Sequence, residues 1–494
     1  MPVTLGRAAS EDARPSQIVK IILLKMNHAE NSIMKNIHTK TPIQANHRTL
    51  DLIEQLVAVA PEGTALGLCD LISAMFSGYF IESGGAVTPA VEAFLRQEIK
   101  DEKERERRTR RAAKALTYGS YNLKELIDKL QEIIWAEGNW KPTVAQGYRI
   151  APVDFTAYRR TAVKKLKTKA YVSDANRAVP AVPIGMIASV GEVNGQRVAL
   201  LKNVVLADLN VNEGAAHKKK LYKQVATELD KDEIAVFDAG FRLVEATEVD
   251  IERCLIRLAK NCTFGKTAGQ IPERTSEKGR TPTQYKAEIV RPLARKHGHK
   301  ILAATAADEI CTMIDESGRE IEVHIWRKLY FLERHLSDVT DERKQHELRH
   351  MPLKVMAIYD PDYDDPLLVG TPLLSLEPAA AYKIYVSRWP VEGVPQTGKY
   401  ILSGGGGTHF VHHPTAMQRL PMLSLIFGSL LKYIAATLPP FRTGFWDRVL
   451  KPTYGRLLRH LKKVGIPLSG QLFKKGSVTA HLPVGYDAIR LAKA

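Results

Sequence analysis

Two apolar runs joined by an Asn-Gly dipeptide constrain the fold of this chain more than any other feature. Residues 183–190 and 197–205 are rich in aliphatic side chains, and Asn194 and Gly195 lie in the link between them. Asn-Gly readily takes the left-handed backbone of a two-residue hairpin turn, so the two runs predict a β-hairpin. An isolated hairpin is barely stable in water, and we therefore expect a larger sheet around it.

Strand and helix patterns alternate around this hairpin. A strand-like segment precedes it at 147–155, and a lysine-rich helical pattern follows at 215–230. Further short apolar strands are expected at 233–241 and 254–264. Three strands, a helix, a strand, a helical turn and a strand predict an α/β fold with a mixed sheet.

The rest of the chain divides by composition, and its length leaves room for several domains. The α/β domain is expected to be interrupted before its last helices by a mainly β insertion that opens with a polar, basic loop. The predicted segments are a loosely ordered basic leader (1–45), a helical DNA-binding domain (46–145), the α/β domain (146–266 and 355–440), the insertion (267–354) and a basic helical tail (441–494).

The net charge indicates what kind of molecule the chain binds, and its cysteine content indicates the redox state of its compartment. The formal net charge of +17 favours a polyanionic partner. The chain has 4 cysteines and no CxxC pair, so neither a zinc site nor a disulfide framework is indicated, and a reducing, cytoplasmic compartment is expected. The apolar stretch at 420–438 is broken by Pro421 and Lys432, which favours a buried helix over a membrane span.

A charged run at 100–116 has an acidic first half and a basic second half, which suits the dipole of a helix. Such a run is usually a solvated helix face, but it could also contact DNA phosphates, and both interpretations stay open. The candidate phosphate contacts are Arg107, Arg108, Arg110 and Arg111.

The segment at 385–399 carries a combination of side chains that no apolar core requires. Tyr385, Arg388, Glu392 and Lys399 follow one another at offsets that predict one face of a helix. A phenol, a guanidinium, a carboxylate and an ammonium on one face suit a site that holds a metal ion beside a phosphate backbone.

This spacing resembles the Y-R-E-K signature of insertion-sequence DDE transposases, in which the Glu is the last of three metal-binding carboxylates. The resemblance implies an RNase H-like mixed sheet with flanking helices. It also implies that Asp154 and Asp238, which each end a predicted strand, are the other two acids. One subgroup of the family carries a β insertion before its final Glu, and residues 267–354 supply such a segment.

The resemblance implies metal-dependent DNA cleavage and strand transfer at the ends of an insertion sequence. The three acids would hold two Mg²⁺ ions, with Mn²⁺ as a substitute, to activate a water or a 3′-hydroxyl and to stabilise the leaving oxygen. Arg388 and Lys399 would grip phosphates, and Tyr385 would donate to the same backbone. The expected partners are double-stranded DNA of the terminal repeats and the target, bound by a homodimer close to the nucleoid and away from any membrane.

Two prolines depart from the expected pattern. Pro390 is compatible with a helix that begins there, but Pro395 is expected to bend the helix between Glu392 and Lys399. A catalytically decayed protein that keeps the fold and binds DNA is therefore the alternative hypothesis. A plain nuclease without strand joining is a third.

Several other residues compete for functional roles. Asp208 and Asp250 are alternatives for the middle acid, and Trp326 is a candidate for stacking on a flipped base, although a tryptophan in a strand is usually core. The acids at 360–365 are interpreted as an exposed connection, and the histidines at 409–413 as a solvated or phosphate-facing loop.

Overall fold

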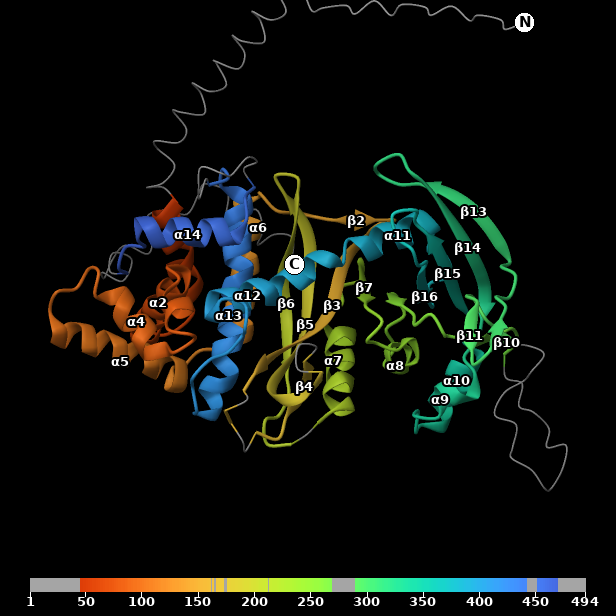
Figure 1. The fold of residues 1–494 in the computed structure, drawn as a ribbon, viewed down its shortest axis with the longest axis horizontal. Helices are drawn as coiled ribbons and strands as arrows, with labels where there is room; N and C mark the ends of the chain where they lie inside the picture. The colour runs from red at the N-terminus through yellow and green to blue at the C-terminus, as the bar shows by residue number, and fades with distance from the viewer. Residues whose placement is uncertain are drawn as a thin grey trace, which may run out of the picture.

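The computed structural model has a mixed α/β fold, with helices gathered at one end and a β meander at the other (Figure 1). The predicted leader, except its last residue, and parts of the predicted basic loop and C-terminal tail lie outside the described residues. The structure describes residues 45–160, 162–163, 166–172, 176–211, 213–268, 289–441 and 451–469.

Five strands form the part of the sheet that contains the predicted hairpin. They are β3 (Tyr148–Arg159), β5 (Arg177–Val193), β6 (Gln196–Leu206), β7 (Glu233–Phe237) and β8 (Cys254–Arg257). β5 pairs antiparallel with β6 and with β3, whereas β7 runs parallel to β3 and β8 runs parallel to β7. The hairpin turn is confirmed, because Asn194 and Gly195 have φ values of 49° and 74°.

Both faces of this sheet are covered. α7 (Ala215–Glu228) packs on one face, where Leu221 and Val225 share a core with Ile187 of β5. α13 (Pro414–Thr437) lies against the other face, and its apolar residues share a core with Ile184 of β5. Alternate residues of one strand therefore enter two different cores, as the pleat of a buried strand requires.

The N-terminal helices pack onto α13. A helix over 45–57 is followed by α2 (Glu62–Phe76), α4 (Val87–Leu95), α5 (Glu102–Tyr118) and α6 (Leu123–Glu137). Their buried residues form a single apolar cluster with α13, in which the rings of Phe76 and Phe427 meet edge to face at 6.4 Å. The helical region therefore shares its core with the α/β region.

α13 is the apolar helix that the sequence places in the interior. Within the described ranges, it is the helix long and apolar enough to cross a membrane, but 89% of its most apolar window is buried inside the protein. Its neighbours, rather than lipid, explain its composition. The prediction of a buried helix is confirmed.

The insertion extends the same sheet. β13 (Glu309–Ile314), β14 (Glu320–Leu329), β15 (Leu353–Tyr359) and β16 (Leu367–Thr371) form an antiparallel meander. β16 then pairs antiparallel with β8, so that the described residues form one continuous 12-stranded sheet. The predicted boundary at 354/355 falls inside β15, and the meander continues to the end of β16.

Short elements complete the described chain. Two strand pairs, β9–β10 and β11–β12, lie outside the main sheet, and α8 follows β7. These elements are α3 (Tyr79–Glu82), β1 (Lys141–Pro142), β2 (Val144–Ala145), β4 (Lys169–Val172), α8 (Leu243–Glu248), β9 (Phe264–Gly265), β10 (Ile289–Val290), β11 (Arg295–His297), β12 (Lys300–Leu302), α9 (Glu333–Leu336), α10 (Glu342–His350) and α14 (Tyr454–Val464).

Candidate active site

Asp154 and Asp238 lie next to each other at the ends of the pairing between two parallel strands. In the register of β3 and β7, the last paired residues are Val153 and Phe237. Asp154 and Asp238 are the next residues of the chain after this pairing, so the parallel register brings the two predicted acids to neighbouring positions. Asp238 directly follows β7, but Asp154 lies inside β3, which continues to Arg159, so the prediction that Asp154 ends a strand is wrong. The structure therefore brings together two residues that are distant in the sequence.

The two aspartates have opposite pKa shifts. Burial raises the pKa of Asp154 to about 6, and the charges of Glu392 and Asp238 add to this rise against the opposing effects of the Phe155 N–H and Arg388. Asp238 is partly buried, but the Ala239 N–H, Arg388 and Tyr385 together hold its pKa below the usual value. Asp154, Asp238 and Glu392 therefore lie within one electrostatic neighbourhood.

The segment that carries the Y-R-E-K residues is not one helix. α11 (Pro378–Val386) ends just after Tyr385, a 3-10 turn η2 (Trp389–Glu392) follows Arg388, and α12 (Gly393–Ser403) contains Lys399. The prediction of one continuous helical face is wrong. The break places Pro395 in the first turn of α12, where its missing N–H would have had no helical partner in any case.

Tyr385 and Arg388 contact the candidate acids. The Tyr385 hydroxyl donates to Asp238 Oδ1 at 3.1 Å, and Arg388 Nη2 donates to Glu392 Oε1 at 2.7 Å. The Arg388 side chain is only 3% exposed, and its Nε finds no hydrogen-bond partner among the described residues. Arg257 of β8 also approaches Asp238 at 3.5 Å. Tyr385 and Arg388, which were expected to contact the DNA backbone, are therefore both engaged with acids of the chain itself.

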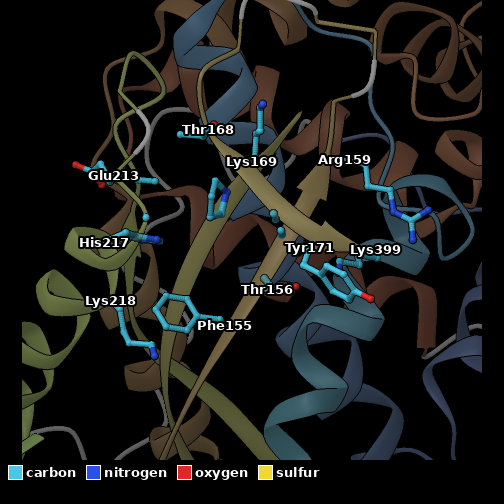
Figure 2. Close-up of a pocket in the computed structure, with 15 residues that line it drawn as sticks. Phe155, Thr156, Arg159, Thr168, Lys169, Tyr171, Glu213, His217, Lys218 and Lys399 are labelled. Atoms are coloured by element: carbon cyan, nitrogen blue, oxygen red, sulfur yellow. The ribbon is translucent and has the colours of Figure 1, made fainter. Parts of the chain in front are cut away.

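Lys399 contacts none of the three acids through a hydrogen bond among the described residues, but the charge of Asp154 acts on it. Its ammonium is 5.6 Å from the ring centre of Tyr158, and it lines a pocket beside β3 (Figure 2). Burial lowers the pKa of Lys399, and the nearby Arg159 lowers it further, while Asp154 opposes both effects. Lys399 thus stays near the acids despite the break in the helix.

α13 fixes the position of α12. A β-carbon on Gly398 would lie 2.8 Å from the Ser424 carbonyl oxygen and 2.9 Å from the Tyr158 hydroxyl, so the two helix backbones meet directly. Gly428 of α13 faces Gly398 at this contact. One helical turn further along α13, Lys432 Nζ donates to the Pro390 carbonyl at 3.3 Å. α13 therefore supports the short segment that carries Glu392 at two points.

Replacing Lys432 by methionine is expected to destabilise the protein by about 1 kcal/mol, because a partly buried hydrogen bond is lost. If Glu392 is catalytic, cleavage should fall by about tenfold, since its support becomes looser. Gly393→Ala should act alike, because its added methyl would occupy the place of Lys432 Nζ. The test measures the free energy of unfolding and the cleavage rate of Lys432→Met, Gly393→Ala and the double variant. Fully additive effects would show that the contact between Lys432 and the Pro390 carbonyl has no role.

The arginines of α5 separate into two groups. Arg108 Nε donates to Asp70 Oδ2 of α2 at 3.0 Å, and the Asp70 side chain is buried. Arg108 is therefore a packing residue, and the expectation of a DNA contact for it is not supported. Arg107 and Arg110 make exposed ion pairs within the helix. Together with Arg111, these two line a groove between α2 and α5.

The competing candidates have other partners. Asp250 pairs with Lys344 at 2.5 Å, and Asp208 accepts from Asn210. Trp326 is 1% exposed and its indole donates to the Ala306 carbonyl, so it cannot stack on a base in this conformation. The acids at 360–365 were expected to form an exposed connection, but one of them does not fit. Asp360 is buried against Arg319 and Tyr382.

The histidine loop contains a buried residue. His409 is 1% exposed, and burial lowers its pKa to about 3, so this histidine is neutral and does not face a phosphate. His412 and His413 are exposed. Sequence analysis also missed Arg257 and Lys432, whose contacts depend on pairing between distant segments and leave no local pattern.

The carboxylates of Asp154, Asp238 and Glu392 are ligands that divalent metals prefer, but they are not arranged as a complete metal site in the described residues. Within the described ranges, no three His, Cys, Asp or Glu side chains already lie together as a metal site. The Glu392 carboxylate binds Arg388 instead, although its side chain is 58% exposed and so has room to rotate. Burial raises the pKa of Asp154, and a divalent cation bound beside it would favour its charged form.

Comparisons with known proteins identify no family. A scan of protein-family models found none that matches this chain, and a search of curated proteins found no match either. Its function is therefore inferred from its own residues.

Proposed function

We propose that this chain is a DDE transposase that cuts and joins DNA with the help of divalent metal ions at Asp154, Asp238 and Glu392. The observation that carries the proposal is the parallel register of β3 and β7, which brings Asp154 and Asp238 to neighbouring positions. Glu392 approaches them from the segment between α11 and α12, and its charge acts on Asp154. Carboxylates that converge from separate elements are what a two-metal site requires.

The arrangement of the sheet supports an RNase H-like catalytic domain. Three antiparallel strands are followed by α7 and by two strands that run parallel to the first. This is the element order that the resemblance implies. The meander between β8 and α11 takes the place of the β insertion of the subgroup.

In this proposal each side chain has a separate task. Bound Mg²⁺ or Mn²⁺ would supply activation of the attacking hydroxyl and charge neutralisation at the leaving oxygen. Tyr385 holds one oxygen of Asp238 through its hydroxyl and so orients that carboxylate. The buried Arg388 guanidinium holds Glu392 while no metal is bound, and the exposed Glu392 side chain would rotate from it to a bound ion. Lys399 would contact the strand on the far side of Asp154.

The proposed partner is double-stranded DNA, in agreement with the net charge of +17. Arg107, Arg110 and Arg111 would contact phosphates of the terminal repeat along the groove between α2 and α5. Two ends of an element must be held together for strand transfer, so we propose a homodimer on DNA, located at the nucleoid.

A specific observation keeps the alternative function in view. Because Glu392 is held by Arg388 and no finished metal cluster is present among the described residues, a protein of this fold could bind DNA without cutting it. The break at Pro390 and Pro395 does not favour this alternative, since both prolines occupy positions that a helix start tolerates.

The test uses the purified chain and a plasmid that carries the DNA flanking its own gene. We expect excision and joining at defined ends with Mg²⁺ or Mn²⁺, and a loss of at least about a thousandfold with Glu392→Gln, because one metal ligand is removed. Glu377→Gln is the matched control, since Glu377 lies outside the candidate site at the start of α11. Tight binding with no cutting by any of the proteins would establish the DNA-binding alternative.

A further inference from the structure

A pocket of about 490 Å³ opens beside Asp154 (Figure 2). Its wall includes Phe155 and Thr156, the two residues of β3 that follow Asp154, and Lys399 of α12. The pocket therefore shares a wall with the candidate active site. Its volume lies in the range of sites that enclose small ligands, and it is large enough for one nucleotide unit.

Cationic side chains from separate elements surround this pocket. Lys169 extends from β4 at the rim, Arg159 comes from the end of β3, and Lys399 comes from α12 (Figure 2). Among the lining residues the acid is Glu213, and its carboxylate is held by Lys220. The lining of the pocket therefore carries more positive than negative charge, which favours an anion.

The start of α7 adds to this positive field. Gly214 caps the helix without a side-chain hydrogen bond, and the first turn contains His217 and Lys218 but no acidic residue. The Lys218 ammonium at this end of the helix opposes the helix dipole, and a bound anion would offset its charge. Lys218 is partly engaged, since it donates to the Gly240 carbonyl at 2.6 Å.

The floor of the pocket is apolar and firmly packed. Phe155 stacks on Phe241 with ring centres 5.3 Å apart and an interplanar angle of 9°. Such a surface suits the carbon face of a sugar, while the cations above it suit the attached phosphate. A polymer passing the acids is a better occupant than a free small anion, because the pocket is open to solvent and two of its lining residues directly follow Asp154 in β3.

We propose that this pocket binds the phosphate next to the one that is cut, on the DNA strand that passes Asp154. Lys169 and Lys399, which both line the pocket, would bind this phosphate, and the start of α7 supplies further positive potential. The inference rests on the proposed function, since it takes the scissile phosphate to lie at Asp154. Binding here would fix the strand on one side of the cut.

Lys169→Met is the decisive variant, and Lys167→Met is its control. Both residues are exposed and lie on the same segment, but only Lys169 lines the pocket. On a duplex ending at the mapped cut site, Lys169→Met should weaken binding by about tenfold and reduce the salt slope by about one. Lys167→Met should leave both unchanged, and equal effects of the two variants would overturn the proposal.

A neutral methylphosphonate locates the phosphate. Placed next to the cut, it should weaken binding by the wild-type chain and have little further effect on Lys169→Met. If the methylphosphonate and Lys169→Met reduced the binding affinity additively, Lys169 would act on a different phosphate and the pocket proposal would be overturned. The proposed cleavage activity would not be affected by that result.

The pocket is also tested without DNA. Inorganic pyrophosphate should raise the melting temperature of the wild type and of Lys167→Met, but not of Lys169→Met. If this pattern appears and no DNA is cut, the anion pocket stands and the transposase function fails. If DNA is cut and pyrophosphate stabilises all three proteins equally, the function stands and the pocket proposal fails.

Discussion

Replacing Asp154 by asparagine is expected to abolish DNA cleavage and at the same time to stabilise the metal-free protein at pH 7.5. Burial raises the pKa of this carboxyl from 3.8 to about 6, so its charged form is disfavoured in the folded state. A rise of this size corresponds to roughly 2–3 kcal/mol of unfolding free energy at neutral pH. Asparagine carries no charge and can still accept from the Phe155 N–H.

The direction in which stability changes with pH follows from the number of protons bound at Asp154 in the folded and unfolded states. Between about pH 4 and pH 6 the folded state binds more protons at Asp154 than the unfolded state, so stability falls as the pH rises through this window. The advantage of Asp154→Asn should therefore be absent near pH 3.5 and complete above pH 6.5. Urea denaturation in EDTA at both pH values measures it.

Asp238→Asn is the matched contrast. Its neighbours hold the pKa of Asp238 below the usual value, so the charged form is favoured by folding and its removal should destabilise the protein above pH 4. Both variants should lose cleavage. If Asp154→Asn proved less stable than the wild type at pH 7.5, burial would not be the dominant influence on that carboxyl.

Gly398→Ala is expected to destabilise the protein by about 1–3 kcal/mol and to reduce cleavage strongly. In an exposed helix this substitution would stabilise by up to about 1 kcal/mol, because alanine is the better helix former. Here the added methyl would meet the Ser424 carbonyl at 2.8 Å, and a backbone atom cannot move aside as a flexible side chain can. α12 would have to shift, and Lys399 would shift with it.

Gly63→Ala is the control for that experiment. Gly63 lies in the first turn of α2, and nothing lies within 4 Å of the position its methyl would take. Thermal melting should show an unchanged or slightly raised midpoint for Gly63→Ala and a clear drop for Gly398→Ala. Equal midpoints would mean that α12 and α13 separate easily.

The local parts of the fold could be predicted from the sequence. The hairpin at Asn194 and Gly195 depends on a turn whose backbone few other residues adopt, and the strand before Asp238 is a short apolar run with a sharp limit. The strand that contains Asp154 was also predicted, but it extends beyond this residue to Arg159. Each of these signals is contained within a few residues. They were sufficient to predict a mixed α/β fold.

The contacts between distant segments could not be predicted in this way. Nothing near Arg108 distinguishes it from Arg107, because its partner Asp70 lies on another helix. The spacing of the Y-R-E-K residues predicts one helix, yet the prolines divide that segment, and Lys432 of α13 holds the divided backbone. Such features depend on tertiary packing, which overrides local periodicity.

The narrow pairing of β8 with β16 has a mechanical consequence. These strands share two residue pairs, and one of them joins Val369 to Arg257, whose guanidinium lies 3.5 Å from Asp238. A displacement of β16 relative to β8 would act directly on Arg257 through this short pairing. Because the guanidinium of Arg257 is one of the groups around Asp238, such a displacement would change the charge environment of that carboxylate without any change in the residues next to it in the sequence.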